Sequence, residues 1–167
     1  PEALELVTPN ATLESLYAQW MEKKLFPSAI RLIAAVLPAL RLFPDMLPLK
    51  SQVQIACDMA KNGCARLAQA DFPKFEDDET TLAQLEARID KTVAWLQTVP
   101  ASAIDAQEAK EITFPVGKAG TRTMTAEDYL KTWALPNVFF HITTAYAMLR
   151  HNGVDLGKTD YLMGSPA

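Results

Sequence analysis

Histidine and cysteine are scarce in this chain, and their scarcity limits its chemistry. Only two of the 167 residues are histidines, His141 and His151, and only two are cysteines, Cys57 and Cys64. On a single helix the two cysteines would lie roughly 10 Å apart, which is farther than the roughly 7 Å between Cα atoms that a disulfide spans. Two unpaired thiols are typical of a reducing compartment, so we expect a cytoplasmic protein.

The chain also lacks a basic excess and a long uninterrupted apolar run. Its net charge is −4, whereas a surface that binds nucleic acid is normally rich in lysine and arginine. The longest apolar run, 135–149, contains Asn137, His141 and Thr143, and it is too short and too polar for a membrane span. We therefore predict neither a nucleic-acid nor a membrane partner, and a single globular domain over 1–167.

Helical patterns dominate the sequence. Caps at Asn10 and Thr12 predict a helix over 13–24, and a second apolar stretch follows over 28–40. Pro48 suits the first turn of a helix that extends to about residue 69. Thr81 and Gln84 have the spacing of a capping box and begin another helix, which ends before Pro100.

A short strand-like region separates these helices from the last one. Apolar residues alternate with other residues at 112, 114 and 116, the turn is over 117–120, and a return strand covers 121–124. Thr125 then caps a final helix that Pro136 kinks or splits, and Gly153 ends it. The predicted fold is all-α, an up-down four-helix bundle with a small β-hairpin before the last helix.

Two segments resemble a known family. The first is PDMLPL followed by QVQIACDMAK (44–49 and 52–61), and the second is EDYLKTWALPNVFFHITTAYAMLRHNGVDLGKTDYL (127–162). Both are similar to the DinB-like superfamily, in the branch catalogued as domain of unknown function 1993. The resemblance implies a four-helix bundle that is often dimeric. Better-known relatives bind zinc, nickel or a similar ion through three histidines, one on the second helix and a His-x-x-x-His pair on the last, and act as hydrolases, thiol-dependent transferases or isomerases.

This chain departs from that three-histidine pattern. Residues that chelate one ion from one helix must lie one turn apart, but the residue one turn after His141 is Ala145, and the residue one turn before it is Asn137. The second helix has no histidine and offers Gln54, Cys57 and Asp58 instead. We therefore expect no metal and no other cofactor. A zinc or nickel ion held by Asp58 and His141 is the alternative.

His141 lies on an apolar stripe of the last helix, and two interpretations stay open. It is either a core histidine bonded to Gln54, Asp58 or a backbone carbonyl, or a pocket histidine that binds a ligand or acts as a general base. The predicted catalytic residues are His141 and Asp58. The predicted ligand-binding residues are Gln54, Asn137, His141 and Tyr129.

The sequence thus supports two hypotheses about function. The first is a metal-free bundle that binds a small, mostly apolar molecule or has a structural role. The second is a metal-dependent hydrolase or thiol-dependent transferase that uses His141. We also expect a homodimer, as the resemblance implies, with Trp133 and Phe140 supplying its interface.

Overall fold

The structure is a computed structural model, and it describes residues 34–105 and 108–163. The chain divides into two units at Leu37, and the elements described below belong to the second unit. They are mostly helices, with one two-stranded antiparallel hairpin placed before the last long helix. This confirms the predicted helical class and the position of the hairpin. The predicted helix over 13–24 and the first part of the stretch over 28–40, residues 28–33, lie outside the described residues.

The first two long helices within the described residues form where the sequence predicts them. Helix α3 spans Leu49–Ala68 with Pro48 at its N-cap, and helix α4 spans Leu82–Leu96. The capping box at the start of α4 is present, since the Thr81 hydroxyl accepts from the Gln84 backbone N–H and the Gln84 side chain accepts from the Thr81 backbone N–H. The C-cap of α3 is Gln69, a non-glycine residue in the left-handed region (φ 52°).

The hairpin packs against one end of the helices. Strand β1 (Glu111–Pro115) pairs antiparallel with β2 (Thr121–Thr125), with Ile112 opposite Met124. The side chains of Ile112 and Phe114 face inward, as their alternation predicts. They form a small core with Leu67 and Tyr129, so the hairpin attaches the end of α3 to the start of the last long helix.

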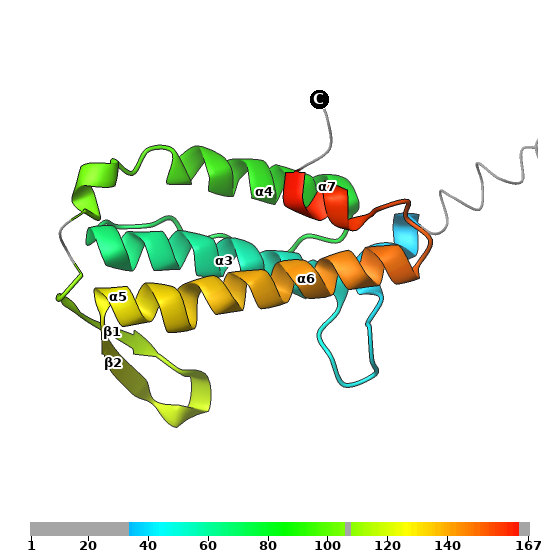
Figure 1. The fold of residues 1–167 in the computed structure, drawn as a ribbon. Helices are drawn as coiled ribbons and strands as arrows, with labels where there is room; N and C mark the ends of the chain where they lie inside the picture. Colours follow the sequence, from blue (N-terminus) through cyan, green and yellow to red (C-terminus); the bar gives the residue numbers. More distant parts are fainter. Residues whose placement is uncertain (1–33, 106–107, 164–167) are drawn as a thin grey trace, which may run out of the picture. The chain divides into compact units, whose positions relative to one another are not determined.

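That last helix runs without a break over 126–151 (Figure 1). It comprises α5 (Ala126–Asp128), a π-helical segment (Tyr129–Ala134) and α6 (Leu135–His151). Pro136 has no backbone N–H to donate, and the wider π turns directly before it accommodate the missing bond. Proline therefore changes the winding of the helix without splitting it. After Gly153 (φ 87°) the chain forms a short helix that the sequence did not predict, α7 (Lys158–Met163).

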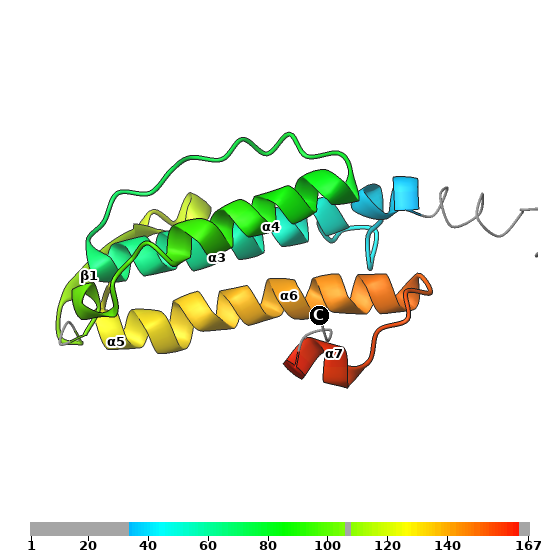
Figure 2. The same cartoon turned by 90° about the horizontal axis from the view of Figure 1, so that it is seen from above.

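Helix α3 lies between α4 and α6 and packs along both (Figure 1). The α3–α6 contact is close where Gly63 faces Ala134, because a Cβ placed on Gly63 would lie 3.4 Å from the Ala134 Cβ. Seen from above, the connection between α3 and α4 runs on the side of these helices away from α6 (Figure 2). At the other end of α3, a second core joins Leu37 in the 3-10 turn Leu37–Ala39, Leu49 and Met148. Among residues 34–105 and 108–163, no helix is long and apolar enough to cross a membrane.

Candidate functional site

An apolar groove lies between three long helices of the described part of the chain. Helices α3, α4 and α6 supply its walls, and α7 with the residue Leu156 lines one end of it. Its volume is about 500 Å³. Three large aliphatic side chains at the groove, Ile89, Val93 and Ile142, are exposed by more than two fifths of their surface. The groove is therefore a place where apolar side chains face an open space.

One polar pair interrupts these apolar walls. His141 on α6 and Gln52 on α3 both line the groove, and His141 Nδ1 is 2.7 Å from Gln52 Oε1. The Gln52 side-chain amide Nε2 in turn donates to the Leu47 backbone carbonyl at 3.1 Å. Gln52 is 2% exposed, so the pair connects α6 to α3 through a buried amide with partners on both of its atoms.

Burial also sets the charge of His141. Desolvation lowers the pKa of His141 below its ordinary value, because an apolar environment disfavours the imidazolium form. The edge of the neighbouring Phe140 ring contacts the imidazole, with centroids 5.1 Å apart and planes at 87°. His141 is therefore neutral at neutral pH, which suits a hydrogen-bonding or proton-accepting group.

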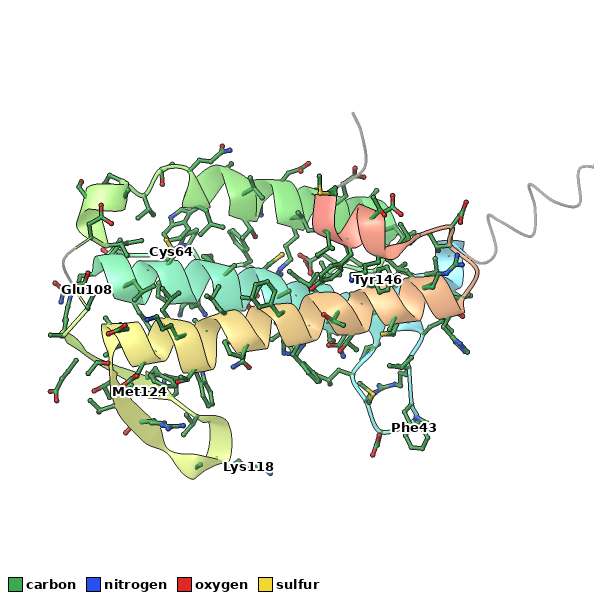
Figure 3. All side chains as sticks on the ribbon, in the orientation of Figure 1. Phe43, Cys64, Glu108, Lys118, Met124 and Tyr146 are labelled. Carbon is green, nitrogen blue, oxygen red and sulfur yellow. The ribbon has the colours of Figure 1, made fainter. Side chains whose placement is uncertain are left out.

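Helix α7 is attached to α6 through Tyr161. The Tyr161 hydroxyl lies 3.0 Å from the Thr143 hydroxyl, and its ring packs edge-on against Tyr146 at a centroid distance of 5.7 Å. Tyr146 lies between α6 and α7 in Figure 3. These contacts place Tyr146 and Tyr161 at the end of the groove, and both belong to its lining.

Cys57 lines the same groove, where burial disfavours its thiolate form. Its side chain is buried, and both it and Cys64 are free thiols. Burial raises the pKa of the Cys57 thiol above its ordinary value, and this effect outweighs the opposing hydrogen bond to Thr92. Because the thiolate is the nucleophilic form, the structure does not provide an activated cysteine at this position.

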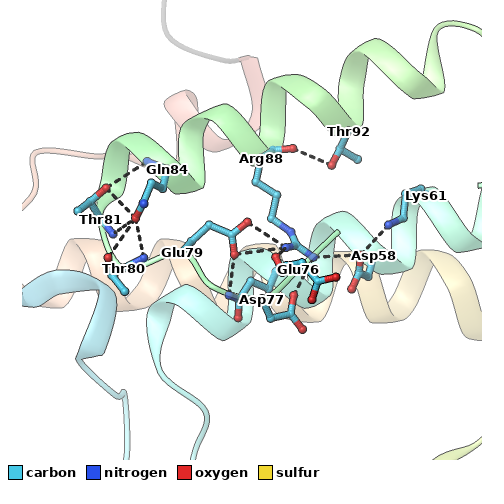
Figure 4. Close-up of polar contacts among 11 residues, drawn as sticks. Asp58, Lys61, Glu76, Asp77, Glu79, Thr80, Thr81, Gln84, Arg88 and Thr92 are labelled. Carbon is cyan, nitrogen blue, oxygen red and sulfur yellow. Dashed lines mark hydrogen bonds and ion pairs between the residues drawn. The ribbon is translucent and has the colours of Figure 1, made fainter. Parts of the chain in front are cut away.

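Asp58 belongs to a cluster of charged residues that lies outside the groove lining (Figure 4). Its Oδ1 atom is 3.1 Å from Arg88 Nη2 and 3.0 Å from Lys61 Nζ. Gln54 joins the same cluster, because its Nε2 donates to Glu79 Oε2 at 2.8 Å. The hydrogen-bond partner of His141 is therefore Gln52, which corrects the expectation that Gln54, Asp58 or a backbone carbonyl fills that role.

The other two predicted ligand-binding residues lie near the hairpin end. Tyr129 is 1% exposed in the hairpin core, and its hydroxyl accepts from Arg66 Nη1 at 3.0 Å. Asn137 is half-buried, and its Nδ2 donates to the Trp133 backbone carbonyl at 2.7 Å. Of the five predicted site residues, only His141 lines the groove. The structure does not bring the five together.

The residues present do not fit the three-ligand metal site that the resemblance implies. Ala145, one turn after His141, has no donor atom, and the partner of His141 on α3 is the amide of Gln52. Within 34–105 and 108–163, no three histidine, cysteine, aspartate or glutamate side chains converge. We therefore derive no chemistry through a metal ion.

Sequence reasoning missed Gln52 and Tyr161. Gln52 is two residues from Gln54, which places the two amides on different faces of α3. Gln52 lies one helical turn before Ala56, which also lines the groove. This spacing is the signal in the sequence that could have identified Gln52. Tyr161 had no comparable signal, because the short helix that carries it was not predicted.

Comparison with known proteins agrees with this description. The family described as domain of unknown function DUF1993 matches residues 8–162. The fold is similar to the crystal structure of a DinB family member protein from Shewanella denitrificans, with a TM-score of 0.74 and 38% sequence identity. That match covers 93% of this chain and 87% of the other. No match was found among curated proteins. The chain therefore belongs to the DUF1993 family and is related to the DinB family.

Proposed function

We propose that this protein binds a small, mostly apolar molecule in the groove between α3, α4 and α6, without a metal ion. The observation that carries the proposal is the make-up of the groove walls, which are apolar except for a few polar groups such as the His141–Gln52 pair. Small-molecule sites in proteins are typically concave and apolar, with a few convergent polar groups that orient the ligand. The groove has this composition, and its volume of about 500 Å³ lies within the usual range.

Burying the groove surface supplies the free energy of binding. Removing apolar surface from water stabilises a complex by roughly 25 cal/mol per Å², and the exposed side chains of Ile89, Val93 and Ile142 are available for it. His141 and Gln52 then restrict the orientation of the ligand, because its polar group has to meet theirs.

The alternative, an enzyme that uses His141 with Asp58 or a metal, has less support. Asp58 is paired with Arg88 and Lys61 and does not line the groove. Cys57 lines the groove, but burial raises its pKa. Neither Asp58 nor Cys57 is therefore placed to assist His141 in hydrolysis or thiol transfer, so the binding function is the one we propose.

We propose three further properties of the protein. The first is an up-down four-helix bundle whose additional helix is the one predicted over 13–24. The second is a cytoplasmic location. The third is a homodimer: Phe140 is 57% exposed and available for an interface, whereas Trp133 is half-buried against the hairpin core. Light scattering should give the mass of two chains, and the mass of one chain would refute the dimer.

The binding function is tested by titrating the full-length protein with n-octanol and following its methyl resonances by NMR. Saturable shifts should be confined to residues that line the groove. Ala145→Phe fills the groove and should abolish the shifts. Ala147→Phe, two residues away on a different face of α6, is the matched control and should bind normally. Absence of saturable binding by the unmodified protein would leave a structural role for the bundle.

A further inference from the structure

We infer that the ligand of the groove is a neutral molecule with a terminal hydrogen-bond donor, such as an alcohol or a phenol, which donates to Nε2 of His141. This inference rests on the proposed function, and it adds the chemical class of the ligand. It follows from the hydrogen bonds of Gln52, from the position of His141 and from the charges that line the groove.

The hydrogen-bond partners of Gln52 determine which of its two terminal side-chain atoms is nitrogen and which is oxygen. One of its terminal atoms is 3.1 Å from the Leu47 carbonyl oxygen, which can only accept a hydrogen bond. That atom is therefore the NH₂ group. The other terminal atom, 2.7 Å from His141 Nδ1, is then the amide oxygen. An amide oxygen cannot donate, so Nδ1 of His141 must carry a proton.

The protonation of Nδ1 determines the role of Nε2. A neutral imidazole carries a single N–H, and burial favours the neutral form of His141. Nε2 therefore has a free lone pair and acts as an acceptor. Among the described residues, no side chain or backbone N–H donates to Nε2, and the imidazole lines the groove. A ligand in the groove can supply the donor.

The charge of the groove excludes an anionic ligand. Among the residues that the structure describes, no lysine or arginine lines it, and the only carboxylate in its lining is Asp160, which accepts the Gly157 backbone N–H at 2.6 Å. The other titratable groups that line it are Cys57, Tyr146 and Tyr161, and none of them is cationic. A carboxylate or phosphate would meet the Nε2 lone pair and lose its hydration without a compensating cation. A hydroxyl group meets a matched acceptor.

The experiment compares three probes of equal chain length on the full-length protein near neutral pH. These are n-octanol, its isomer methyl heptyl ether, which cannot donate, and octanoate, which is anionic. We expect n-octanol to bind about three- to tenfold more tightly than the ether, as one hydrogen bond predicts, and octanoate to bind most weakly. In His141→Phe, the alcohol and the ether should bind equally well, because the acceptor is lost and the apolar wall is kept.

A second measurement does not depend on any ligand. Long-range ¹H–¹⁵N spectra of the imidazole should show the proton of His141 on Nδ1, and Gln52→Leu should remove this preference. A proton on Nε2 would overturn the inference, as would equal affinities for n-octanol and the ether or tighter binding of octanoate. In those cases the proposed binding function would survive, whereas failure of all three probes to bind would overturn both.

Discussion

Arg88 and Glu79 form an ion pair that is almost completely removed from solvent. Arg88 Nη1 lies 3.0 Å from Glu79 Oε1, and Arg88 is 2% exposed. The same guanidinium also contacts Asp58 on α3 and Asp77 in the connection between α3 and α4 (Figure 4). Arg88, which belongs to α4, therefore links the connection between α3 and α4 to helix α3. The cluster therefore holds together two walls of the groove from outside its lining.

Replacing Arg88 should strongly destabilise the protein. In Arg88→Met, the carboxylate of Glu79 stays buried without its cation, and breaking a buried pair in this way costs about 3–5 kcal/mol. Urea denaturation should therefore show a large loss in the free energy of unfolding. The matched control is Lys131→Ala, which removes the exposed ion pair with Glu127 and should leave stability unchanged. Equal effects of the two substitutions would contradict the structural role of Arg88.

The same ion pair predicts a dependence of stability on pH. Burial alone would raise the pKa of Glu79, but hydrogen bonds from Gln54 and Arg88 outweigh it, and the pKa lies below the ordinary value. A carboxyl group with a lowered pKa in the folded state stabilises the protein above the unfolded pKa, about 4.3. That stability is lost as the pH falls through the folded pKa.

The test is the free energy of unfolding of Glu79→Gln and of the unmodified protein, measured across the acid range. The variant should be less stable near neutral pH and should lose less stability on acidification. Parallel curves for the two proteins would show that Glu79 does not contribute to the acid dependence.

Gly153, which follows the end of α6, gives a prediction about the backbone. Gly153 has φ 87°, a conformation that side chains of L-residues rarely adopt. Gly153→Ala should therefore cost about 1–2 kcal/mol of stability, even though nothing lies within 4 Å of the added Cβ. Gly157 lacks this conformation, and its added Cβ would make ordinary contacts. Thermal unfolding should accordingly show that Gly157→Ala is the milder change.

Local sequence signals predicted most of the described helices and strands. The capping box at Thr81, the alternation through Ile112 and Phe114, and the cap at Thr125 each depend on residues a few positions apart. Pro136 was harder to interpret, because a proline either ends a helix or is accommodated by nearby wide turns. Whether the helix ends or continues at Pro136 depends on packing against α3, where Ala134 contacts Gly63. A contact between residues so far apart in the sequence cannot be predicted from a local pattern.

The candidate site was less predictable for the same reason. The position of His141 on an apolar stripe indicated a buried or pocket residue, and the structure places it at the groove. The hydrogen-bond partner of His141 depends on how α3 is rotated about its own axis relative to α6. That rotation decides whether Gln52 or Gln54 faces His141. The role of Arg88 was not foreseen either, because its partners come from α3 and from an irregular segment.

Cys57 provides a chemical test of groove occupancy. It lines the groove, whereas Cys64, on the same helix, does not. Burial raises the pKa of both thiols, so both should react slowly with iodoacetamide near neutral pH. Saturating n-octanol should slow the alkylation of Cys57 further and leave Cys64 unaffected, as peptide mass spectrometry can measure. Equal slowing at both cysteines would indicate a general stabilisation and would argue against binding in the groove.

We propose that the groove between α3, α4 and α6 holds a small apolar ligand that is oriented by His141. A crystal structure of the full-length protein grown with n-octanol tests it most directly. We expect an alkyl chain along Ile89, Val93 and Ile142, with the hydroxyl within hydrogen-bonding distance of His141 Nε2. A groove filled by another part of the same chain or by a second copy, with no octanol in it, would contradict the claim.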